Sequence, residues 1–142
     1  MSIEHTPVGR TLAAYAAAVN AKDVDAFAAI YDDDVHIFDS WGRWQYSGID
    51  EWRAMATGWF ESLGDETVEV GFADLRSVVG DDVAFGHAAV TFTGISATAE
   101  RERAMTNRLS IGLHKKDGVW KVVHEHTSLP IDMESGSAIF SH

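Results

Sequence analysis

The sequence contains no cysteine and few basic residues, and both shortages narrow the functions open to it. Without cysteine the chain forms no disulfide, no thiolate metal site and no cysteine nucleophile. This composition fits a reducing compartment, so we expect a cytoplasmic protein. Lys and Arg number 11 against 22 Asp and Glu, which gives a formal net charge of -11. Because so acidic a surface repels phosphate groups, we expect no nucleic-acid partner and no binding to membranes.

Long apolar segments are also missing. The longest apolar run, residues 12–19, has eight residues, far short of the ~20 that span a bilayer. The N-terminal stretch MSIEHTPVGR lacks the basic start and the apolar stretch of a signal peptide, so we expect none. Hydrophobic residues nevertheless make up 46% of the 142 positions, which is enough for a sizeable core. Residues 1–142 are therefore predicted to form a single domain.

Three helices are predicted in the first part of the chain. Thr6 and Pro7 suit the N-cap and the first position of a helix whose apolar residues recur at positions 12, 15, 16 and 19. Asp23 suits the N-cap of a short second helix. A third helix follows the YSG sequence and carries apolar residues between Ile49 and Leu63.

The remainder of the chain is predicted to form strands. A short strand pair lies between the second and third helices, and four long strands follow Thr67. Gly and Asp residues mark their turns near 80–82, 94–96 and 115–118. Helices followed by an antiparallel meander predict an α+β fold.

The last hairpin has a predicted register. If residues 115–118 form its loop, Arg108 lies opposite Glu125 on one face, and His124 and His126 lie on the other. The attractive pair and the apolar character of the second face favour this register, with both histidines toward the core. A bulge at the end of the loop would instead shift the register by one and turn both histidines outward.

Asp39 is the first candidate for chemistry. It alternates with Val35 and Ile37, which predicts that its carboxylate points inward, where burial raises its pKa toward that of a useful general base. The alternative is that the strand has already ended and Asp39 only caps the next turn. Tyr15, on the buried stripe of the first helix, either packs in the core or donates a hydrogen bond to a developing oxyanion.

Two stretches resemble known families. AYAAAVNAKDVDAFAAIYDDDVHIFDSWG, Ala14 to Gly42, resembles the opening of the ketosteroid isomerases of the NTF2-like superfamily, including the spacing from Tyr15 to Asp39. DGVWKVVHEHTSLP, Asp117 to Pro130, is similar to the closing strand of SnoaL-like and calcium/calmodulin-kinase association-type domains. The resemblance implies an NTF2-like cone: three N-terminal helices in the concave face of a curved, mostly antiparallel sheet, with a cavity at one end. It also implies a homodimer.

The resemblance further implies roles for single residues. Asp39 matches the base and Tyr15 the oxyanion donor. The isomerases add a second, protonated aspartic acid, but no acid lies between Ala104 and Gly112 in the corresponding strand here. Asn107 is the nearest inward-facing candidate, which puts true steroid isomerisation in doubt.

The histidine pair has three interpretations. His124 and His126 could bind zinc with His87 or His36, but no sequence signature supplies the rest of the site, so we expect no metal and no cofactor. They could be hydrogen-bonded in a polar layer of the sheet. We favour polar anchoring in the cavity, where His126 beside Asn107 orients a ligand or moves a proton and His124 contacts the ligand.

Tryptophans complete the predicted site. Trp41 and Trp44 flank the turn after Asp39, where large aromatic rings can wall an apolar pocket, and Trp59 faces the same region from the third helix. The sequence thus predicts a SnoaL-like or ketosteroid isomerase-like protein that binds an apolar small molecule, in which Asp39 takes a proton beside a carbonyl group. Isomerisation, cyclisation and dehydration share this step. The rival hypothesis is a non-catalytic ligand-binding or oligomerisation module.

Overall fold

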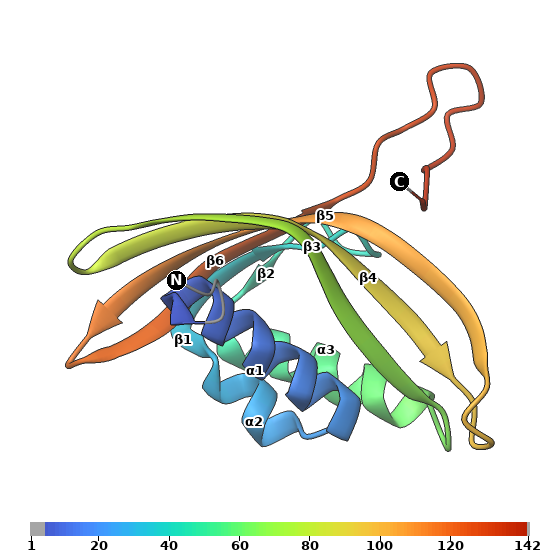
Figure 1. Ribbon diagram of the computed structural model, residues 1–142, viewed down its shortest axis with the longest axis horizontal. Coiled ribbons are helices and arrows are strands. Elements are labelled where there is room, and N and C mark those ends of the chain that lie inside the picture. The colour runs from blue at the N-terminus through green and yellow to red at the C-terminus, as the bar shows by residue number, and fades with distance from the viewer. Residues whose placement is uncertain (1–4, 142) are drawn as a thin grey trace.

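The computed structural model describes residues 5–141. Residues 1–4, part of the stretch expected not to be a signal peptide, lie outside the described residues, as does residue 142. The helices and strands follow one another along the chain in the predicted order (Figure 1). They are α1 (Pro7–Ala21), α2 (Val24–Ala29), β1 (Tyr31–Phe38), β2 (Tyr46–Ser47), α3 (Ile49–Ser62), β3 (Thr67–Val79), β4 (Val83–Ile95), β5 (Arg101–Lys116) and β6 (Val119–Ser128).

Local sequence sets the ends of the helices. The hydroxyl of Thr6 accepts a hydrogen bond from the backbone N–H of Gly9 at 3.0 Å, and α1 ends at Lys22 in the left-handed conformation, with φ of 53°. The carboxylate of Asp23 caps α2 by accepting from the N–H of Ala26 at 3.0 Å. Both predicted N-caps are therefore confirmed.

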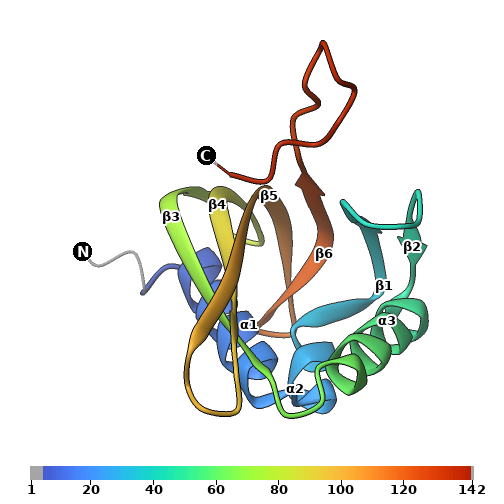
Figure 2. The same cartoon turned by 90° about the vertical axis from the view of Figure 1, so that its right-hand side faces the viewer.

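All six strands belong to one sheet, in the order β2-β1-β6-β5-β4-β3. Neighbouring strands are antiparallel except β1 and β6, which run parallel. The sheet arches over α1, α2 and α3, which lie together on its concave side (Figures 1 and 2). The predicted α+β cone with three helices in a curved sheet is thus confirmed.

Irregular pairing accounts for the curvature of the sheet. The register shifts between Ala73 and Arg76 where β3 meets β4, and Asp74 there has a positive φ of 57°. Further shifts occur where β4 meets β5 and where β5 meets β6. Because an extra residue bends its strand and increases the local twist, the sheet wraps around the helices instead of lying flat on them.

The core lies between the helices and the concave face. Phe27 of α2 is fully buried, and its ring lies 5.3–5.9 Å, centroid to centroid, from the rings of four neighbours. The first helix also packs directly on the sheet. Here α1 approaches β4 so closely that a Cβ added to Gly86 would lie 2.6 Å from Val8 Cγ1. A larger residue at position 86 would therefore force Val8 and the neighbouring backbone at Arg76 to shift.

The register predicted for the last hairpin is wrong. Its loop contains only Asp117 and Gly118, both with positive φ, and not the four residues predicted. Because the difference is two residues, it would by itself leave the same side chains on the inward face. The inward and outward faces of β6 are exchanged farther along the strand. Leu113 pairs with Val122, whereas the preceding residue of β5, Gly112, pairs with His124 and leaves one residue of β6 unpaired. One extra residue in β6 at this bulge turns every later side chain to the opposite face.

The bulge exchanges the histidines for a glutamate on the concave face. Glu125 lies opposite Ile111 of β5 and next to Ile37 of β1, and it is 6% exposed. His124 and His126 point to the convex side of the sheet. Arg108 pairs with Ser128, so the predicted Arg108–Glu125 pair does not form.

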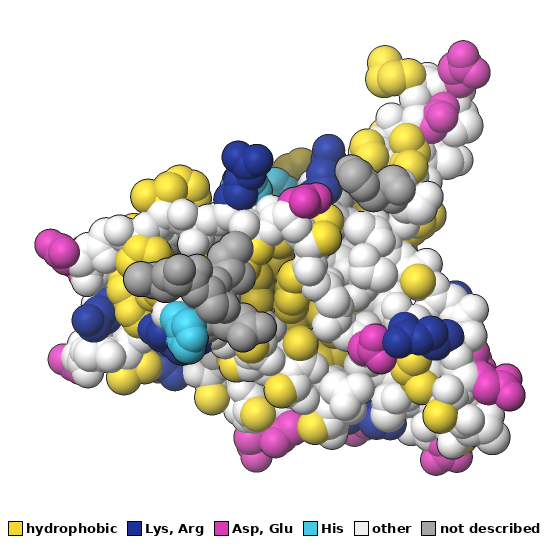
Figure 3. All heavy atoms as spheres, viewed as in Figure 1, with side chains coloured by type: hydrophobic (Ala, Val, Ile, Leu, Met, Phe, Trp, Pro, Cys, Tyr) yellow, Lys and Arg dark blue, Asp and Glu magenta, His cyan; other side chains and the backbone are white. Residues whose placement is uncertain are grey.

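The surface agrees with the composition. Acidic side chains are spread over the face in Figure 3 and do not gather in one patch. No helix among residues 5–141 is long and apolar enough to cross a membrane. The segment after β6 projects away from the helices and carries exposed Ile131 and Met133 (Figures 1 and 2).

Candidate functional site

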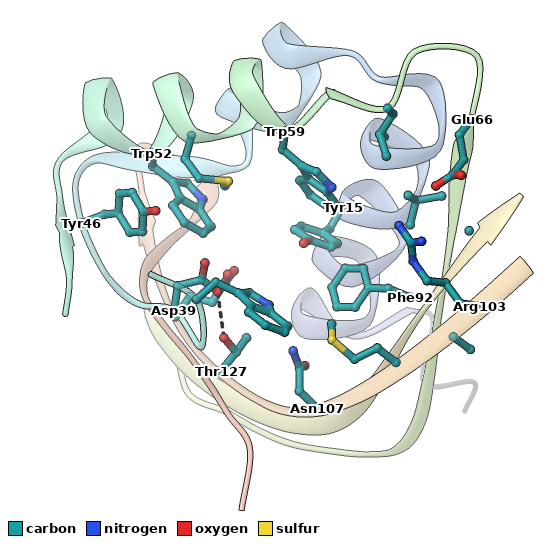
Figure 4. A pocket seen from close by; sticks show the side chains of 18 residues that line it. Tyr15, Asp39, Tyr46, Trp52, Trp59, Glu66, Phe92, Arg103, Asn107 and Thr127 are labelled. Carbon is teal, nitrogen blue, oxygen red and sulfur yellow. Dashed lines mark hydrogen bonds between the residues drawn. The ribbon is translucent and has the colours of Figure 1, made fainter. Parts of the chain in front are cut away.

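A cavity of about 460 Å³ lies between the helices and the concave face of the sheet. It receives side chains from α1, from the end of β1, from β2 and α3, and from β3 to β6 (Figure 4). Its lining residues are Tyr15, Asp39, Trp41, Tyr46, Trp52, Met55, Trp59, Leu63, Glu66, Val68, Phe92, Gly94, Arg103, Ala104, Met105, Asn107, Glu125 and Thr127. Its volume falls within the range of about 300–1,000 Å³ typical of small-molecule sites.

Aromatic rings form most of the wall. Trp52 and Trp59 extend from the same face of α3, two turns apart, and Phe92 faces Trp59 from the sheet with ring centroids 6.0 Å apart (Figure 4). Trp41 covers another side and is itself stacked on Phe140, with centroids 5.7 Å apart and planes 13° apart. Flat apolar walls of this kind suit a flat organic ligand.

Asp39 places a half-buried carboxyl group in this cavity. Its Oδ1 accepts hydrogen bonds from the backbone N–H of Ser40 and from the hydroxyl of Thr127, both at 3.0 Å (Figure 4). Within residues 5–141, Oδ2 has no hydrogen-bond partner. Burial raises the pKa of Asp39, and the bonds from Thr127 and Ser40 oppose that rise because they stabilise the ionised form.

Both sequence-based interpretations of Asp39 hold in part. The regular strand ends at Phe38, and the carboxylate does bond the first N–H of the turn. The side chain still continues the inward alternation of β1 and lines the cavity.

Glu125 places a second carboxyl group in the same cavity. The hydroxyl of Tyr31 donates to Glu125 Oε1 at 2.7 Å, and Oε2 has no hydrogen-bond partner in the described chain. Burial between apolar neighbours raises the pKa of Glu125 from 4.5 to about 7; the bond from Tyr31 lowers it, and the negative charge of Asp39 adds to the rise. Burial therefore favours the protonated form of this carboxyl group far more than solvent would.

Two neutral groups of the cavity have polar atoms without a hydrogen-bond partner among residues 5–141. The hydroxyl of Tyr15 makes no hydrogen bond to any described residue. Burial, together with the charges of Glu125 and Asp39, raises the pKa of Tyr15 well above 10, so it keeps its proton. Asn107 is 4% exposed, and its buried Oδ1 has no partner among residues 5–141. A buried amide oxygen without a partner is costly, so it points to a bound group that donates a hydrogen bond to it.

Charged groups mark the other side of the cavity. Arg103 and Glu66 lie across from Asp39 in Figure 4, and Gly94 lies beside the Glu66 carboxylate. Arg103 makes no hydrogen bond or salt bridge with the described part of the chain. The cavity is therefore apolar in its middle and polar at both sides.

The structure brings five of the eight predicted site residues together. All five line the cavity, and they come from α1, from the end of β1 and the loop after it, from α3 and from β5. They are Tyr15, Asp39, Trp41, Trp59 and Asn107.

The other three predicted residues lie elsewhere. Trp44 is 89% exposed, because the loop after Asp39 turns its ring into solvent. His124 and His126 face the convex side, because the bulge in β6 reverses the faces of the strand. There Nδ1 of His124 lies 2.7 Å from the backbone oxygen of His36, and both histidine rings lie against the edge of Phe38. Their predicted place in the cavity was wrong.

The arrangement of the histidines does not support the hypothesis of a zinc site. Among residues 5–141, no group of three or more His, Cys, Asp and Glu side chains is placed to hold a metal ion.

Sequence reasoning missed several members of the cavity. Glu125 was assigned to the face opposite the histidines, and Thr127 was not considered, because nothing in the sequence marks the bulge. Tyr46 and Trp52 were not assigned to the cavity, although both line it. One signal in the sequence is that Val123, Glu125 and Thr127 are spaced two apart, which places them on one face of a strand. The spacing does not show whether that face points inward.

Comparisons with known proteins agree with this architecture. A family model described as a SnoaL-like domain matches residues 8–132. No curated protein matches the sequence. An NTF2-like protein of unknown function from Pseudomonas putida KT2440 is 24% identical, with a TM-score of 0.82 over 95% of this chain and 92% of that one. Rv3472 of Mycobacterium tuberculosis, also of unknown function, is 20% identical, with a TM-score of 0.79 over 96% and 78%. Aln2 from a Streptomyces species is 17% identical, with a TM-score of 0.76 over 90% and 92%. At these identities the solved structures show a shared fold alone.

Proposed function

This chain belongs to the SnoaL-like family, and on that premise we propose that it binds a small, mostly apolar carbonyl compound and removes a proton beside the carbonyl group. One observation carries the proposal. The free oxygen of Asp39, the unbonded hydroxyl of Tyr15 and the unpartnered amide of Asn107 all line one cavity with aromatic walls.

Each polar group has a role that its surroundings support. Asp39 is the base, since its Oδ2 is free and burial raises its pKa without removing the two bonds that favour the ionised form. Tyr15 keeps its proton and donates it in a hydrogen bond to the enolate oxygen as charge develops there. Asn107 supplies a second donor through its amide NH₂.

The apolar walls supply binding and exclude water. A flat ring system between Trp41, Trp59 and Phe92 displaces solvent from the carboxylate of Asp39. In a less polar site, the attraction between the donors and the developing oxyanion becomes stronger. Binding and catalysis therefore rest on different parts of one cavity.

Deuterium exchange tests the proposal directly, because isomerisation, cyclisation and dehydration share the removal of one proton. Saturated ketones with flat aromatic or polycyclic bodies are incubated with the protein in D₂O, and loss of the α-proton signal is followed by NMR. We expect exchange by the wild type and a rate lower by about 10²–10⁴-fold in Asp39→Asn, the usual contribution of a general base. Asp50→Asn, at an exposed position of α3, serves as the matched control.

Two results would contradict the enzymatic proposal. Equal exchange rates in wild type and Asp39→Asn would remove Asp39 from the chemistry. Tight ketone binding that does not depend on Asp39, with no exchange by the wild type, would favour the non-catalytic ligand carrier.

A further inference from the structure

Glu125 is a buried acid that the chemistry proposed above does not use. It lies on the same concave face as Asp39 and lines the same cavity. Tyr31 holds one oxygen of its carboxyl group at 2.7 Å, and the other oxygen bonds to nothing in residues 5–141. The group is thus held in place by one atom and available through the other.

Asp39 and Glu125 differ in what stabilises a negative charge on each. Asp39 is half-buried and accepts two hydrogen bonds on one oxygen. Glu125 is 6% exposed, accepts one, and is flanked along the sheet by Ile37 and Ile111. The negative charge of Asp39 further disfavours a charge on Glu125, so Glu125 is the carboxyl group of the two that more readily keeps a proton. The cavity therefore contains a base and an acid at once.

A second, smaller cavity adjoins Glu125. It has a volume of about 20 Å³ and shares Tyr15, Phe92, Glu125 and Thr127 with the main cavity. That volume accommodates one water molecule, which needs at least about 10–15 Å³ and two to four polar partners. Hydroxyl and carboxyl groups of Tyr15, Glu125 and Thr127 can supply those partners.

We propose, resting on the function proposed above, that the substrate is a β-hydroxy carbonyl compound and that Glu125 is the general acid that protonates its departing hydroxyl group. The free carboxyl oxygen of Glu125, the base Asp39 and a pocket of the size of one water molecule lie together at one side of the cavity. Loss of a hydroxyl group as water needs an acid at the leaving oxygen and a place for the water, and Glu125 and the small pocket beside it supply both.

The step balances without any further reactant. Asp39 takes the proton from the α-carbon, and the electron pair of that C–H bond becomes the new Cα=Cβ bond through an enolate whose oxygen Tyr15 holds. The Cβ–O bond breaks, and its electron pair takes the proton of Glu125, which releases water. The products are an α,β-unsaturated carbonyl compound and water, and nothing is oxidised or reduced. Transfer of the proton from Asp39 to Glu125 restores both carboxyl groups.

Two ketones of the same skeleton separate this inference from the function on which it rests. One carries a β-hydroxyl group and the other does not. Deuterium exchange into the ketone without the hydroxyl reports on Asp39. Formation of the unsaturated product from the hydroxy ketone, followed by its ultraviolet absorbance, reports on Glu125. Both are measured for wild type, Glu125→Gln and the exposed control Glu61→Gln.

We expect Glu125→Gln to lower elimination by at least about 10²-fold and exchange by less than about 10-fold, since glutamine keeps the bond from Tyr31 but has no acidic proton. Glu125→Asp should recover part of the elimination. Exchange without elimination by the wild type would overturn the inference and leave the proposed function intact. Equal falls of both rates in Glu125→Gln, or unchanged elimination, would also overturn it. Absence of both reactions in the wild type would overturn the proposed function and the inference with it.

The pH profile of the wild type gives a second test that needs no variant. Glu125 must carry a proton to act as the acid, so elimination should decline as the pH rises through about 7. Exchange, which needs ionised Asp39, should not decline over that range. A rate of elimination that stays level or increases from pH 7 to pH 9, after subtraction of the uncatalysed rate, would contradict the role of Glu125.

Discussion

Replacing Glu125 with glutamine should make the stability of the protein less dependent on pH. Folding places this carboxyl group between apolar neighbours and raises its pKa from 4.5 to about 7, chiefly through burial. Below pH 4.5 the group is protonated in the folded and unfolded states alike. Between these two values the unfolded chain loses the proton first, so stability falls as the pH rises, and above pH 7 the loss is complete.

The size of the effect follows from the two pKa values. At about 1.4 kcal/mol per pH unit, the interval from 4.5 to about 7 corresponds to a loss of about 3 kcal/mol. Most of this loss, about 2–3 kcal/mol, falls between pH 5 and pH 8. Glutamine fills the same space and still accepts the bond from Tyr31, but it has no charge to bury. The variant should therefore lack this part of the pH dependence.

Urea unfolding at several pH values, followed by the fluorescence of the five tryptophans, measures the difference. Glu125→Gln should gain about 2–3 kcal/mol on the wild type between pH 5 and pH 8, while the exposed control Glu61→Gln should follow the wild type. If wild type and Glu125→Gln change in parallel over this range, the carboxyl group is not held in the dry environment inferred for it, and the reasoning fails.

Two further substitutions test other parts of the structure. Thr127→Val removes the donor 3.0 Å from Asp39 Oδ1, so the pKa of Asp39 should rise and the acid limb of the exchange profile should move to higher pH. An unmoved limb would contradict this contact. Gly86→Ala puts a Cβ 2.6 Å from Val8 and should lower the free energy of unfolding in urea by about 1–3 kcal/mol. The control Gly112→Ala, with no atom within 4 Å of the added Cβ, should lower it far less. Equal losses would contradict the close approach of α1.

Much of the fold could be predicted because its signals are local. Thr6 and Asp23 cap helices through bonds to N–H groups three residues away, and such motifs are visible in a short stretch of sequence. The turns of the meander are marked by Gly and Asp for the same reason. The inward direction of Asp39 and Asn107 followed from alternation over a few regular residues.

The rest of the site depends on one event that has no local signal. Predicting the bulge in β6 requires knowledge of both paired strands, because a bulge places two residues of one strand opposite one residue of its partner. Its consequence is large, since it moves His124 and His126 out and brings Glu125 in. The exposed position of Trp44 likewise follows from the path of a loop, which periodicity does not describe. The predicted homodimer and cytoplasmic location stay predictions.

A titration of the side-chain carboxyl carbons of Asp39 and Glu125 by isotope-edited NMR tests the central claim most directly. That claim is that one cavity contains an ionised carboxylate and a protonated carboxyl group near neutral pH. The account predicts that Glu125 titrates near pH 7 and Asp39 at a clearly lower pH, and that Asp39→Asn lowers the pKa of Glu125 by removing a neighbouring charge. A pKa of Glu125 close to the ordinary 4.5, or one insensitive to Asp39, would contradict it.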